Sequence, residues 1–587
     1  MIKVSPPGVR PVALALTLIV VLGAAVCSAQ IVDSGRISGT VQDSSGGVIA
    51  NADVVFRNDA TGLTDRTATN GDGLFVSQPL APAEYSVAVE QPGFAKVIQH
   101  VHLEVGQRAS ITLILSPGKA SETVNVEANA AFLGTETSTL SNLRTEHAVE
   151  NLPLDGRNFA ELVDLSAGVS PAQSQVSTVA LSAVRGETSY SVNGLRPEEN
   201  NYLLDGISDT ENHNGLGIVL FPPLDAVEEF REETSGADAR YGRGGGGTIN
   251  LVFKSGTDQF HGDLFEFLRN SDLDAKNFFD KRKPPFKMNQ FGVTFGGPLL
   301  GRRNPKTFFF VDYQGTRTDQ GLTYISTVPT ALERTGNFSA LPQQIYNPLT
   351  TVQAANGTYS RTPFAGNIIP SGQISQVGQN LINLYPLPNL PGFANNYLYQ
   401  PTRTLVEDEY DGRVDHRFSD KDSSFLRYSH ARDNIYQPGP LPAPAVGGAI
   451  SGLSREPSDQ AVLSENHVFS STAINTARVG WSRVGINSTD ANAGQALATQ
   501  VGIPGSNVPG NPLTDGLPMI PVTGAATLGS YGNLPATIVS NNYQVDDSVS
   551  LIRGRHTFTF GGELQRRQYN IFQTANLRGT MSFTTAY

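Results

Sequence analysis

The chain has 587 residues and a formal net charge of −12, a size that exceeds one ordinary hydrophobic core and predicts two to four domains. The acidic balance argues against nucleic acid as a general partner. Glycine (59), tyrosine (18) and phenylalanine (29) are frequent while tryptophan (1) and methionine (4) are rare, a turn-rich and aromatic-rich composition that favours strands over helices and predicts a mainly β fold.

The first 29 residues have the features of a secretory signal peptide. Lys3 and Arg10 form a short basic start, an apolar run follows, and the small residues 27–29 predict cleavage after Ala29. Lipid attachment at Cys27 is the alternative, but Val26 stands where that processing normally requires Gly, Ala or Ser. Cleavage removes the only cysteine and two positive charges, so we expect a mature chain of charge −14 without disulfides or thiolate metal sites. No later run reaches the ~20 apolar residues of a membrane-spanning helix.

Residues 34–117 are expected to form a small antiparallel β-sandwich, because short alternating strands such as GRISGTVQD, EYSVAVE and RASITLILS are separated by Gly, Pro and Asn-Gly turns. The order GTVQDSSGGVIANADVVF, then TATNGDGLFVSQPLAPAEYSVAVEQPGF, resembles the carboxypeptidase regulatory-like domain. The resemblance implies a periplasmic transthyretin-like sandwich without peptidase chemistry, since no HxxE zinc motif is present and His100 and His102 alternate along one strand. Asp72 is a candidate calcium ligand, but the other acidic positions of a calcium loop are missing, which favours a tight turn.

Residues 118–132, GKASETVNVEANAAF, are small and polar and are expected to be a linker that carries one strand-like peptide. Within it Glu122, Thr123, Val124, Asn125 and Val126 resemble a TonB box, the exposed segment that an inner-membrane energy-coupling protein captures by adding it as a strand to its own sheet. The alternative is a plain linker strand, because five residues make a short motif.

Residues 133–255 mix helix-like pieces (TEHAVENLPL, NFAELVDLS) with short strands (SYSVNGL, NNYLLDGIS, TINLVFKSG) and are expected to form an α+β plug domain. Two strings, SVNGLRPEENNYLLDGIS at 191–208 and ARYGRGGGGTINLVFKSGTDQFHGDLFEF at 239–267, resemble the plug and plug-to-barrel junction of the Oar-like TonB-dependent receptors. The first string supplies the candidate plug motif, which consists of Asn193, Gly194, Arg196, Asn201, Asp205 and Gly206.

A glycine-rich loop in the second string satisfies GxGxxG at Gly242, Gly244 and Gly247. A dinucleotide site needs a hydrophobic strand before the glycines and a helix after them, whereas here TSGADAR precedes and the strand TINLVF follows. Close backbone packing of a plug loop is therefore preferred. Walker A, HExxH and CxxC sequences are absent from the chain, and no catalytic residue, metal or cofactor is assigned.

Residues 256–587 show a series of amphipathic strands and are expected to form an antiparallel transmembrane β-barrel. In Tyr410–Phe418 one face carries Tyr410, Gly412, Val414 and Phe418, and the other carries Asp411, Arg413, Asp415 and Arg417. In 556–566, likewise, Phe558, Phe560 and Leu564 alternate with Thr557, Thr559, Glu563 and Gln565. We expect the charged face to line a wet interior and the aromatic face to meet lipid.

The lengths of the connections distinguish a membrane barrel from a soluble sandwich. Long connections (270–286, 318–409, 433–459, 488–542) alternate with short ones (301–306, 419–422, 470–473, 553–555), as in outer-membrane barrels with long outer loops and short periplasmic turns. Long loops at a barrel mouth are natural places for ligand capture. The first loop has Asp274, Lys276, Lys281, Arg282 and Lys283, which are candidates for contact with an anionic ligand, with a solvated loop as the simpler alternative.

The Oar-like resemblance continues through QFGVTFGGPL, KTFFFVDYQGTR, PTALERTGNFS and DHRFSDKDSSFLRYS. It implies energised uptake of a scarce small ligand (siderophore, carbohydrate or peptide), with the TonB complex of the inner membrane and outer-membrane lipid as partners. This branch also permits a receptor that organises or adheres at the cell surface without transport, and no enzyme activity is expected. We expect about ten strands by Tyr587, whereas plugged receptors close about 22, so the barrel is expected to be partial and the chain incomplete.

Overall fold

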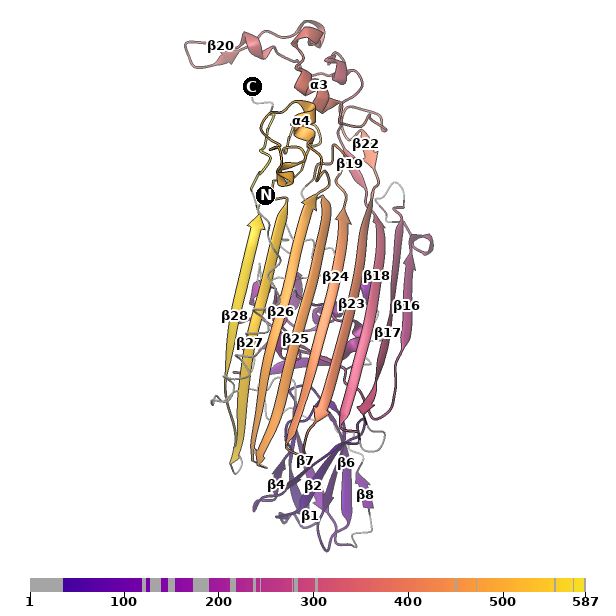
Figure 1. Cartoon of the computed structure of the whole chain (residues 1–587), viewed down its shortest axis with the longest axis vertical. Coiled ribbons are helices and arrows are strands. Elements are labelled where there is room, and N and C mark those ends of the chain that lie inside the picture. The colour runs from indigo at the N-terminus through magenta and orange to yellow at the C-terminus, as the bar shows by residue number, and fades with distance from the viewer. Residues whose placement is uncertain are drawn as a thin grey trace.

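The computed structural model describes residues 35–118, 123–126, 139–145, 154–172, 189–211, 218–235, 239–242, 244–276, 278, 283–300, 305–448, 451–470, 472–530, 532–553, 556–573 and 575–584. The expected signal peptide and Glu122 lie outside these residues. A sandwich occupies one end of the long axis, a tall sheet with a small domain behind it the middle, and long loops the other end (Figure 1). No helix among the described residues combines the length and apolarity needed to cross a membrane.

The sandwich has two sheets around a core that includes Val54, Phe56 and Leu113. One sheet has the order β4-β1-β7 and the other β3-β2-β5-β6-β8. The strands are β1 (Arg36–Asp43), β2 (Asp53–Asn58), β3 (Thr64–Ala68), β4 (Leu74–Val76), β5 (Ala83–Glu90), β6 (Lys96–Leu103), β7 (Arg108–Leu115) and β8 (Thr123–Val126). Most strand pairs of the sandwich are antiparallel as predicted, but β1 pairs with β7 in parallel, and β8 of the linker adds to β6 in parallel. Alternation along a strand marks its two faces but carries no information about the direction of its neighbour.

The plug is built on a five-stranded sheet of order β13-β12-β15-β14-β9, flanked by the pair β10-β11. The strands are β9 (Leu140–Thr145), β10 (Val169–Ala172), β11 (Ser189–Val192), β12 (Asn201–Leu204), β13 (Ile207–Ser208), β14 (Val227–Ser235) and β15 (Thr248–Phe253), and the 3-10 helices are η1 (Asp155–Arg157), η2 (Phe159–Leu165), η4 (Pro197–Glu199) and η5 (Leu224–Ala226). The segment NFAELVDLS forms η2, a 3-10 helix whose first turn is capped by Asn158, whose side chain accepts from the Ala160 N–H. Most of TEHAVENLPL lies outside the described residues.

Nine antiparallel strands make the tall sheet, and each pairs with the next along the chain. They are β16 (Leu264–Asn270), β17 (Phe286–Leu300), β18 (Thr307–Gly321), β23 (Thr402–Arg417), β24 (Asp422–Gln437), β25 (Gly452–Ser470), β26 (Ala473–Asp490), β27 (Ala536–Arg553) and β28 (His556–Gln573). Several strands are longer than predicted: the connection expected at 318–409 spans 322–401. The outer ends keep pairing while their outward positions become polar, as at Arg317 and Asp408, so the apolar alternation no longer marks them.

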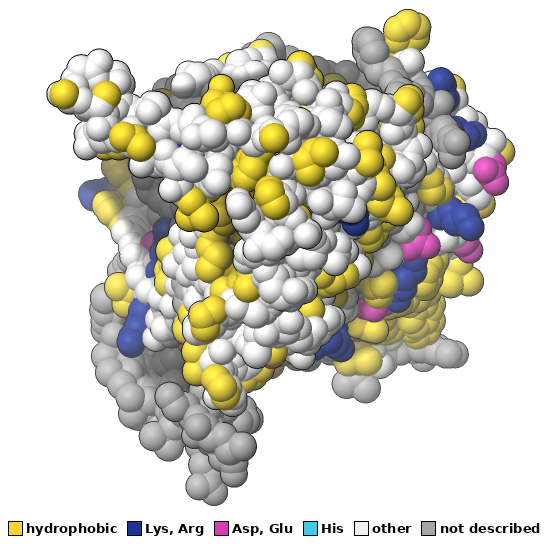
Figure 2. Space-filling model, turned by 90° about the horizontal axis from the view of Figure 1, so that it is seen from above, with side chains coloured by type: hydrophobic (Ala, Val, Ile, Leu, Met, Phe, Trp, Pro, Cys, Tyr) yellow, Lys and Arg dark blue, Asp and Glu magenta, His cyan; other side chains and the backbone are white. Residues whose placement is uncertain are grey.

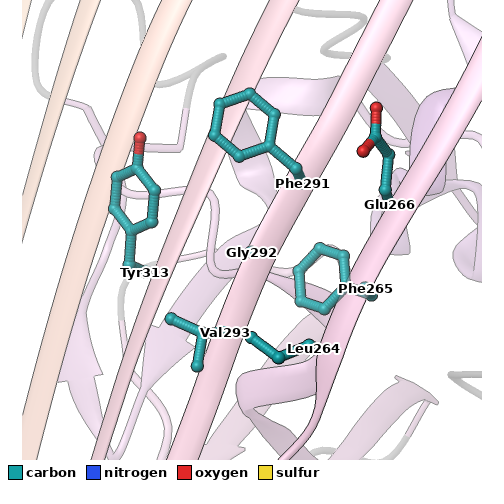
Figure 3. A pocket seen from close by; sticks show the side chains of 7 residues that line it. All are labelled: Leu264, Phe265, Glu266, Phe291, Gly292, Val293 and Tyr313. Atoms are coloured by element: carbon teal, nitrogen blue, oxygen red, sulfur yellow. The ribbon is translucent and has the colours of Figure 1, made fainter.

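The two faces of the sheet match the predicted alternation. Tyr410, Val414 and Phe418 are exposed on the outer face, and Asp411 and Arg413 are buried on the inner face. Part of the inner face meets the plug, because inner-face residues such as Phe310, Ala431, Val484 and Ile538 share one hydrophobic core with it. On β16, β17 and β18, a shallow depression of about 480 Å³ is lined by side chains that include Leu264, Phe291, Val293 and Tyr313 (Figure 3). Much of this lining belongs to the surface predicted to meet lipid, so the depression is not a candidate receptor site.

Three connections, 322–401, 438–451 and 491–535, pack together above the sheet, and we call them the outer cap. They share a core that includes Val328, Tyr385, Leu441, Leu497 and Ile520. The cap has β19 (Tyr324–Ser326), β20 (Val352–Gln353), β21 (Tyr359–Ser360), β22 (Tyr397–Tyr399), α3 (Gln376–Ile382), α4 (Leu497–Val501), η7 (Glu333–Thr335), η8 (Pro348–Thr350), η9 (Ala365–Asn367), η10 (Ser371–Gln373) and η11 (Pro512–Thr514). The first outer loop, outside the cap, contains η6 (Ser271–Leu273).

Candidate functional site

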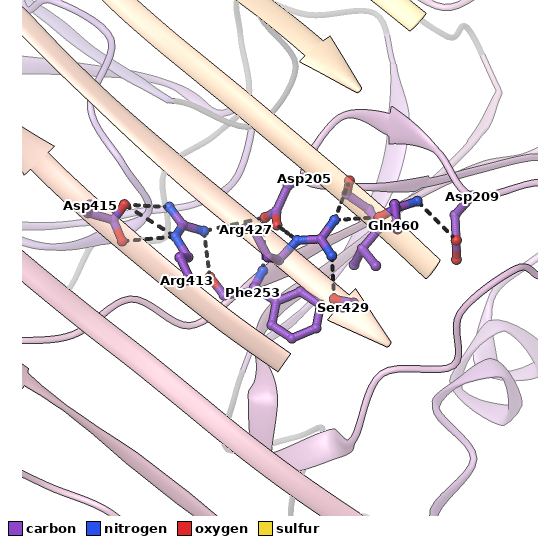
Figure 4. Close-up of polar contacts among 9 residues, drawn as sticks. Asp205, Asp209, Phe253, Arg413, Asp415, Arg427, Ser429 and Gln460 are labelled. Atoms are coloured by element: carbon purple, nitrogen blue, oxygen red, sulfur yellow. Dashed lines mark hydrogen bonds and ion pairs between the residues drawn. The ribbon is translucent and has the colours of Figure 1, made fainter. Parts of the chain in front are cut away.

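Asp205 joins the plug to the barrel wall. It lies in the tight turn between β12 and β13, with a φ of 49°, and its side chain is fully buried. Within the plug its Oδ1 accepts from the Phe253 N–H at 3.1 Å. From the wall, Arg427 Nε donates to Oδ2 at 2.5 Å and Arg413 Nη1 approaches Oδ1 at 3.4 Å (Figure 4). One plug carboxylate therefore meets two cations of β23 and β24 away from water.

The two arginines are themselves held in place by further contacts. Arg413 donates to Asp415 Oδ1 at 2.9 Å and, from Nη1, to the Phe253 carbonyl at 2.9 Å. Arg427 donates to Ser429 Oγ at 2.6 Å and to Gln460 Oε1, and its guanidinium carbon lies 4.8 Å from the centre of the Phe253 ring (Figure 4).

Gln460 continues this network back to the plug, because its Nε2 donates to Asp209 Oδ1 at 3.2 Å. We call Asp205, Asp209, Arg413, Arg427 and Gln460 the Asp205 cluster. Charge-assisted bonds of this kind are strong when they are desolvated, and removal of one partner is costly.

The residues after Asp205 also meet the wall. The Ser208 N–H donates to Gln544 Oε1 of β27 at 2.9 Å. Gly206 has a φ of 76°, and a Cβ atom there would lie 2.1 Å from Arg478 Nη1. Glycine at 206 thus satisfies both the left-handed backbone and the close approach of an arginine.

The other residues of the predicted plug motif lie elsewhere. Asn193 and Gly194 form a turn after β11 in which both have positive φ, and Asn193 Nδ2 donates to the Thr234 carbonyl. Arg196 is exposed just before η4. The Asn201 N–H donates to the Gly247 carbonyl at 2.9 Å at the start of β12. The structure therefore brings Asp205 and Gly206 to the barrel wall and uses the rest of the motif inside or at the surface of the plug.

The glycine-rich loop packs closely against the plug backbone, as predicted. A Cβ atom at Gly244 would lie 1.9 Å from the Glu199 carbonyl oxygen. The Gly246 N–H donates to that same carbonyl at 3.1 Å, and the Gly247 N–H donates to Asn200 Oδ1 at 3.0 Å. The loop continues into the buried strand β15, so it lacks the helix that a dinucleotide site requires.

The sandwich is attached to the plug through the backbone N–H and the backbone carbonyl of Val105. The Val105 N–H donates to Glu229 Oε2 at 2.5 Å, and Arg231 Nη1 donates to the Val105 carbonyl at 2.8 Å. Burial raises the pKa of the Glu229 carboxyl to about 8, an effect that the Val105 N–H opposes and that Glu228 and Glu104 reinforce. We call Val105, Glu229 and Arg231 the Val105 clamp.

The segment that resembles a TonB box is paired rather than free along its described backbone. Thr123–Val126 form β8, which runs parallel to β6 with Thr123 opposite Lys96 and Val126 opposite Gln99. It is the outermost strand of its sheet. The sequence predicts an exposed peptide, and the structure gives it a strand partner on the sandwich.

Comparison with known proteins assigns the barrel. A family model described as "Outer membrane beta barrel domain" matches residues 252–587, more than half of the chain. The chain belongs to this outer-membrane β-barrel family. A second model, described as "Carboxypeptidase regulatory-like domain", matches residues 36–116. The protein is therefore an outer-membrane β-barrel protein with an N-terminal carboxypeptidase regulatory-like domain, as the sequence predicts.

A TonB-dependent transporter and two outer-membrane proteins of known structure are among the proteins similar to this chain. It is 24% identical over 327 residues to the TonB-dependent transporter Oar of Myxococcus xanthus, across 51% of this chain and 29% of that transporter, which agrees with the Oar-like resemblance. The outer membrane transporter YddB of Escherichia coli (13% identity, TM-score 0.44) and the siderophore receptor PirA of Acinetobacter baumannii (13%, 0.40) each align over 73% of this chain and 48% of their own. The chain thus spans less than half of the length of these proteins.

Sequence reasoning missed the partners of Asp205. It placed Arg413 on the inner face of the barrel protein but gave Arg427, Arg478 and Gln460 no role. Arginines at inward positions of barrel strands are the signal that could have found them, since buried cations need an acidic partner. In the first outer loop, Lys283 Nζ donates to the Ser271 carbonyl and, at 3.1 Å, to the Asp274 carbonyl, while Lys281 and Arg282 lie outside the described residues.

Proposed function

We propose that this protein is a TonB-dependent outer-membrane receptor that takes up a scarce ligand, with the segment Glu122–Val126 as its energy-coupling strand. The observation that carries the proposal is the plug itself: a folded domain packs against the inner face of the barrel wall and is tied to it by the Asp205 cluster. A barrel filled in this way needs a device that moves the plug. The proposal agrees with the similarity to a TonB-dependent transporter.

The strand order of the plug determines which strand a pull would reach first. The chain passes from β8 to β9, which among the described strands is an edge strand of the plug sheet and pairs with β14 alone. A pull applied at residues 122–126 acts first on β9. The opposite edge, β12 and β13, is the one that Asp205, Ser208 and Asp209 fasten to the wall. The pull is therefore expected to peel β9 from β14 and open part of the plug while the rest stays attached.

The pull also has to release β8 from the sandwich. A coupling protein that captures the segment by strand addition competes with β6 for the same backbone groups, or adds to the outer edge of β8. The parallel pairing spans only four residues, Lys96–Gln99 opposite Thr123–Val126, so its displacement is a small step.

Deletion of residues 122–126 tests the proposal. We expect energised accumulation of labelled ligand in cells to be abolished, while membrane insertion and ligand binding remain. Deletion of residues 128–132 is the matched control, because it shortens the same linker by five residues and keeps the segment. Unchanged uptake after the first deletion would refute the coupling role, and a phenotype limited to adhesion would favour a receptor that organises the surface without transport.

A further inference from the structure

The outer cap is nearly free of charge. Its three connections contain four charged side chains, Glu333, Arg334, Arg361 and Asp515, whose formal charges cancel, whereas 16% of the whole chain is charged. Arg361 Nε donates to Thr351 Oγ1 at 2.9 Å, and Arg334 donates to the Pro386 carbonyl. The cap therefore offers no excess of either charge.

The three connections of the cap are also fastened to one another by hydrogen bonds. Tyr385 Oη donates to the Ala526 carbonyl at 2.5 Å, Asn380 Nδ2 donates to the Val501 carbonyl at 3.2 Å, and the Gly529 N–H donates to the Ala445 carbonyl at 3.0 Å. These bonds join the three connections above their shared core. A binding surface that is already ordered loses less conformational entropy when it takes up a ligand.

The surface of the cap is made of amides, hydroxyls and single aromatic rings. Residues 336–402 alone contain nine Asn and seven Gln, and exposed Tyr346, Tyr359 and Phe393 stand among them. In the β20–β21 hairpin, Gln353 lies directly opposite Tyr359, and both are exposed. Seen from above, the face shows mostly white atoms, which are backbone and side chains that are neither charged nor hydrophobic, interspersed with hydrophobic side chains, and most charged groups lie toward its sides (Figure 2).

Each alternative ligand chemistry asks for a different surface. A ferric siderophore or another anion needs convergent cations, and a charged peptide needs fixed charges of opposite sign. A lipid-like ligand needs a continuous apolar groove. An uncharged sugar chain needs amide and hydroxyl groups for its hydroxyls and aromatic faces for its C–H surfaces, which is the composition of the cap.

From this distribution we propose that the outer cap binds an uncharged oligosaccharide, with Tyr346 and, in the β20–β21 hairpin, Gln353 and Tyr359 among its contacts. The inference rests on the proposed function for its context, since it names the class of ligand that the receptor takes from outside. It is separable from that function, because binding at the cap requires neither the coupling segment nor an energised membrane.

The test uses the purified full chain in detergent with neutral hexasaccharides built of glucose, mannose or xylose. Two anionic probes, an oligogalacturonate hexasaccharide and a ferric catecholate, are compared with them. We expect at least one neutral chain to bind, with an affinity that changes less than about twofold between 50 and 500 mM NaCl because no charges are screened. Tyr346→Ala and Tyr359→Ala should each weaken that binding by roughly three- to tenfold. Phe418→Ala, an equally exposed aromatic position at the opposite end of the barrel, should leave it unchanged.

Binding confined to the anionic probes, binding of no neutral chain, or wild-type affinity in both tyrosine variants would overturn the inference. Retained heat-modifiability of each variant in electrophoresis shows that its barrel is folded. Neutral-chain binding that survives deletion of residues 122–126 while uptake also continues would leave this inference standing and refute the coupling proposal instead.

Discussion

Replacement of Asp205 by Asn tests the role of the Asp205 cluster. The change keeps the size of the side chain and the Phe253 N–H contact but removes the charge that Arg427 and Arg413 share. Arg413 retains Asp415 as a partner, whereas the remaining hydrogen-bond acceptors of Arg427 among the described residues are the neutral groups of Ser429, Gln460 and Leu204. Both arginines are buried, but only Arg413 keeps a carboxylate as a hydrogen-bond acceptor, so the loss of the Asp205 charge affects mainly Arg427.

The expected cost is that of breaking a buried ion pair from one side, about 3–5 kcal/mol. At about 1.4 kcal/mol per factor of ten, the detached plug becomes roughly two to three and a half orders of magnitude more populated. The assay is urea-dependent thiol labelling of a cysteine placed at Ala226, which is fully buried in the plug core. Asp164→Asn, at an exposed plug position, is the matched control.

Two outcomes decide the matter. We expect the labelling midpoint to fall for Asp205→Asn and to recover in part when Arg427→Gln is added, because the second change removes the unpaired buried cation. Equal midpoints for Asp205→Asn and Asp164→Asn would refute the reasoning. It would also be refuted if Asp205→Asn with Arg427→Gln destabilised the attached plug by more than the sum of the two single changes.

Three further predictions concern the contacts that hold the plug in place. Gly206→Ala should lower the free energy of plug detachment, and with it the labelling midpoint. The loss should be at least the ~1–2 kcal/mol of left-handed strain, because the new Cβ would also lie 2.1 Å from Arg478 Nη1. Gly242→Ala, with no atom within 4 Å, should leave the midpoint unchanged. The raised pKa of Glu229 means that the Val105 clamp is strongest below pH ~4.5 and weakens as the pH rises through about 8. The urea midpoint for release of the sandwich from the plug should therefore fall over this pH range. Glu229→Gln should make that midpoint nearly independent of pH. A disulfide between cysteines at Asn142 and Glu232, which are opposite in the β9–β14 register, should stop uptake until it is reduced, and undiminished uptake in the oxidised form would contradict the peeling of β9.

The sequence could predict features that depend on near neighbours. The alternation around Val414 marks both faces of β23, because side chains of a strand point to opposite sides in turn. The packing of the glycine-rich loop followed from the strand that comes after it. Both inferences needed fewer than about twenty residues of context, and both hold in the structure.

Features that depend on distant partners were out of reach. Asp205 and Arg427 are 222 residues apart, and nothing in either segment names the other. The same applies to the parallel pairing of β1 with β7, and to Val105 with Glu229 across 124 residues. Which part of the inner face the plug covers also escaped prediction, since a charged stripe has the same pattern whether water or a plug covers it.

Cross-linking in cells tests the central claim most directly. A photoreactive amino acid at Val124, in the strand proposed to couple to the inner membrane, should form an adduct with TonB, and dissipation of the proton gradient should change its yield. The same group placed at Ala128, beyond the segment, should give little or none. A Val124 protein that inserts into the outer membrane and yields no TonB adduct, or no more than the Ala128 protein, would contradict the account.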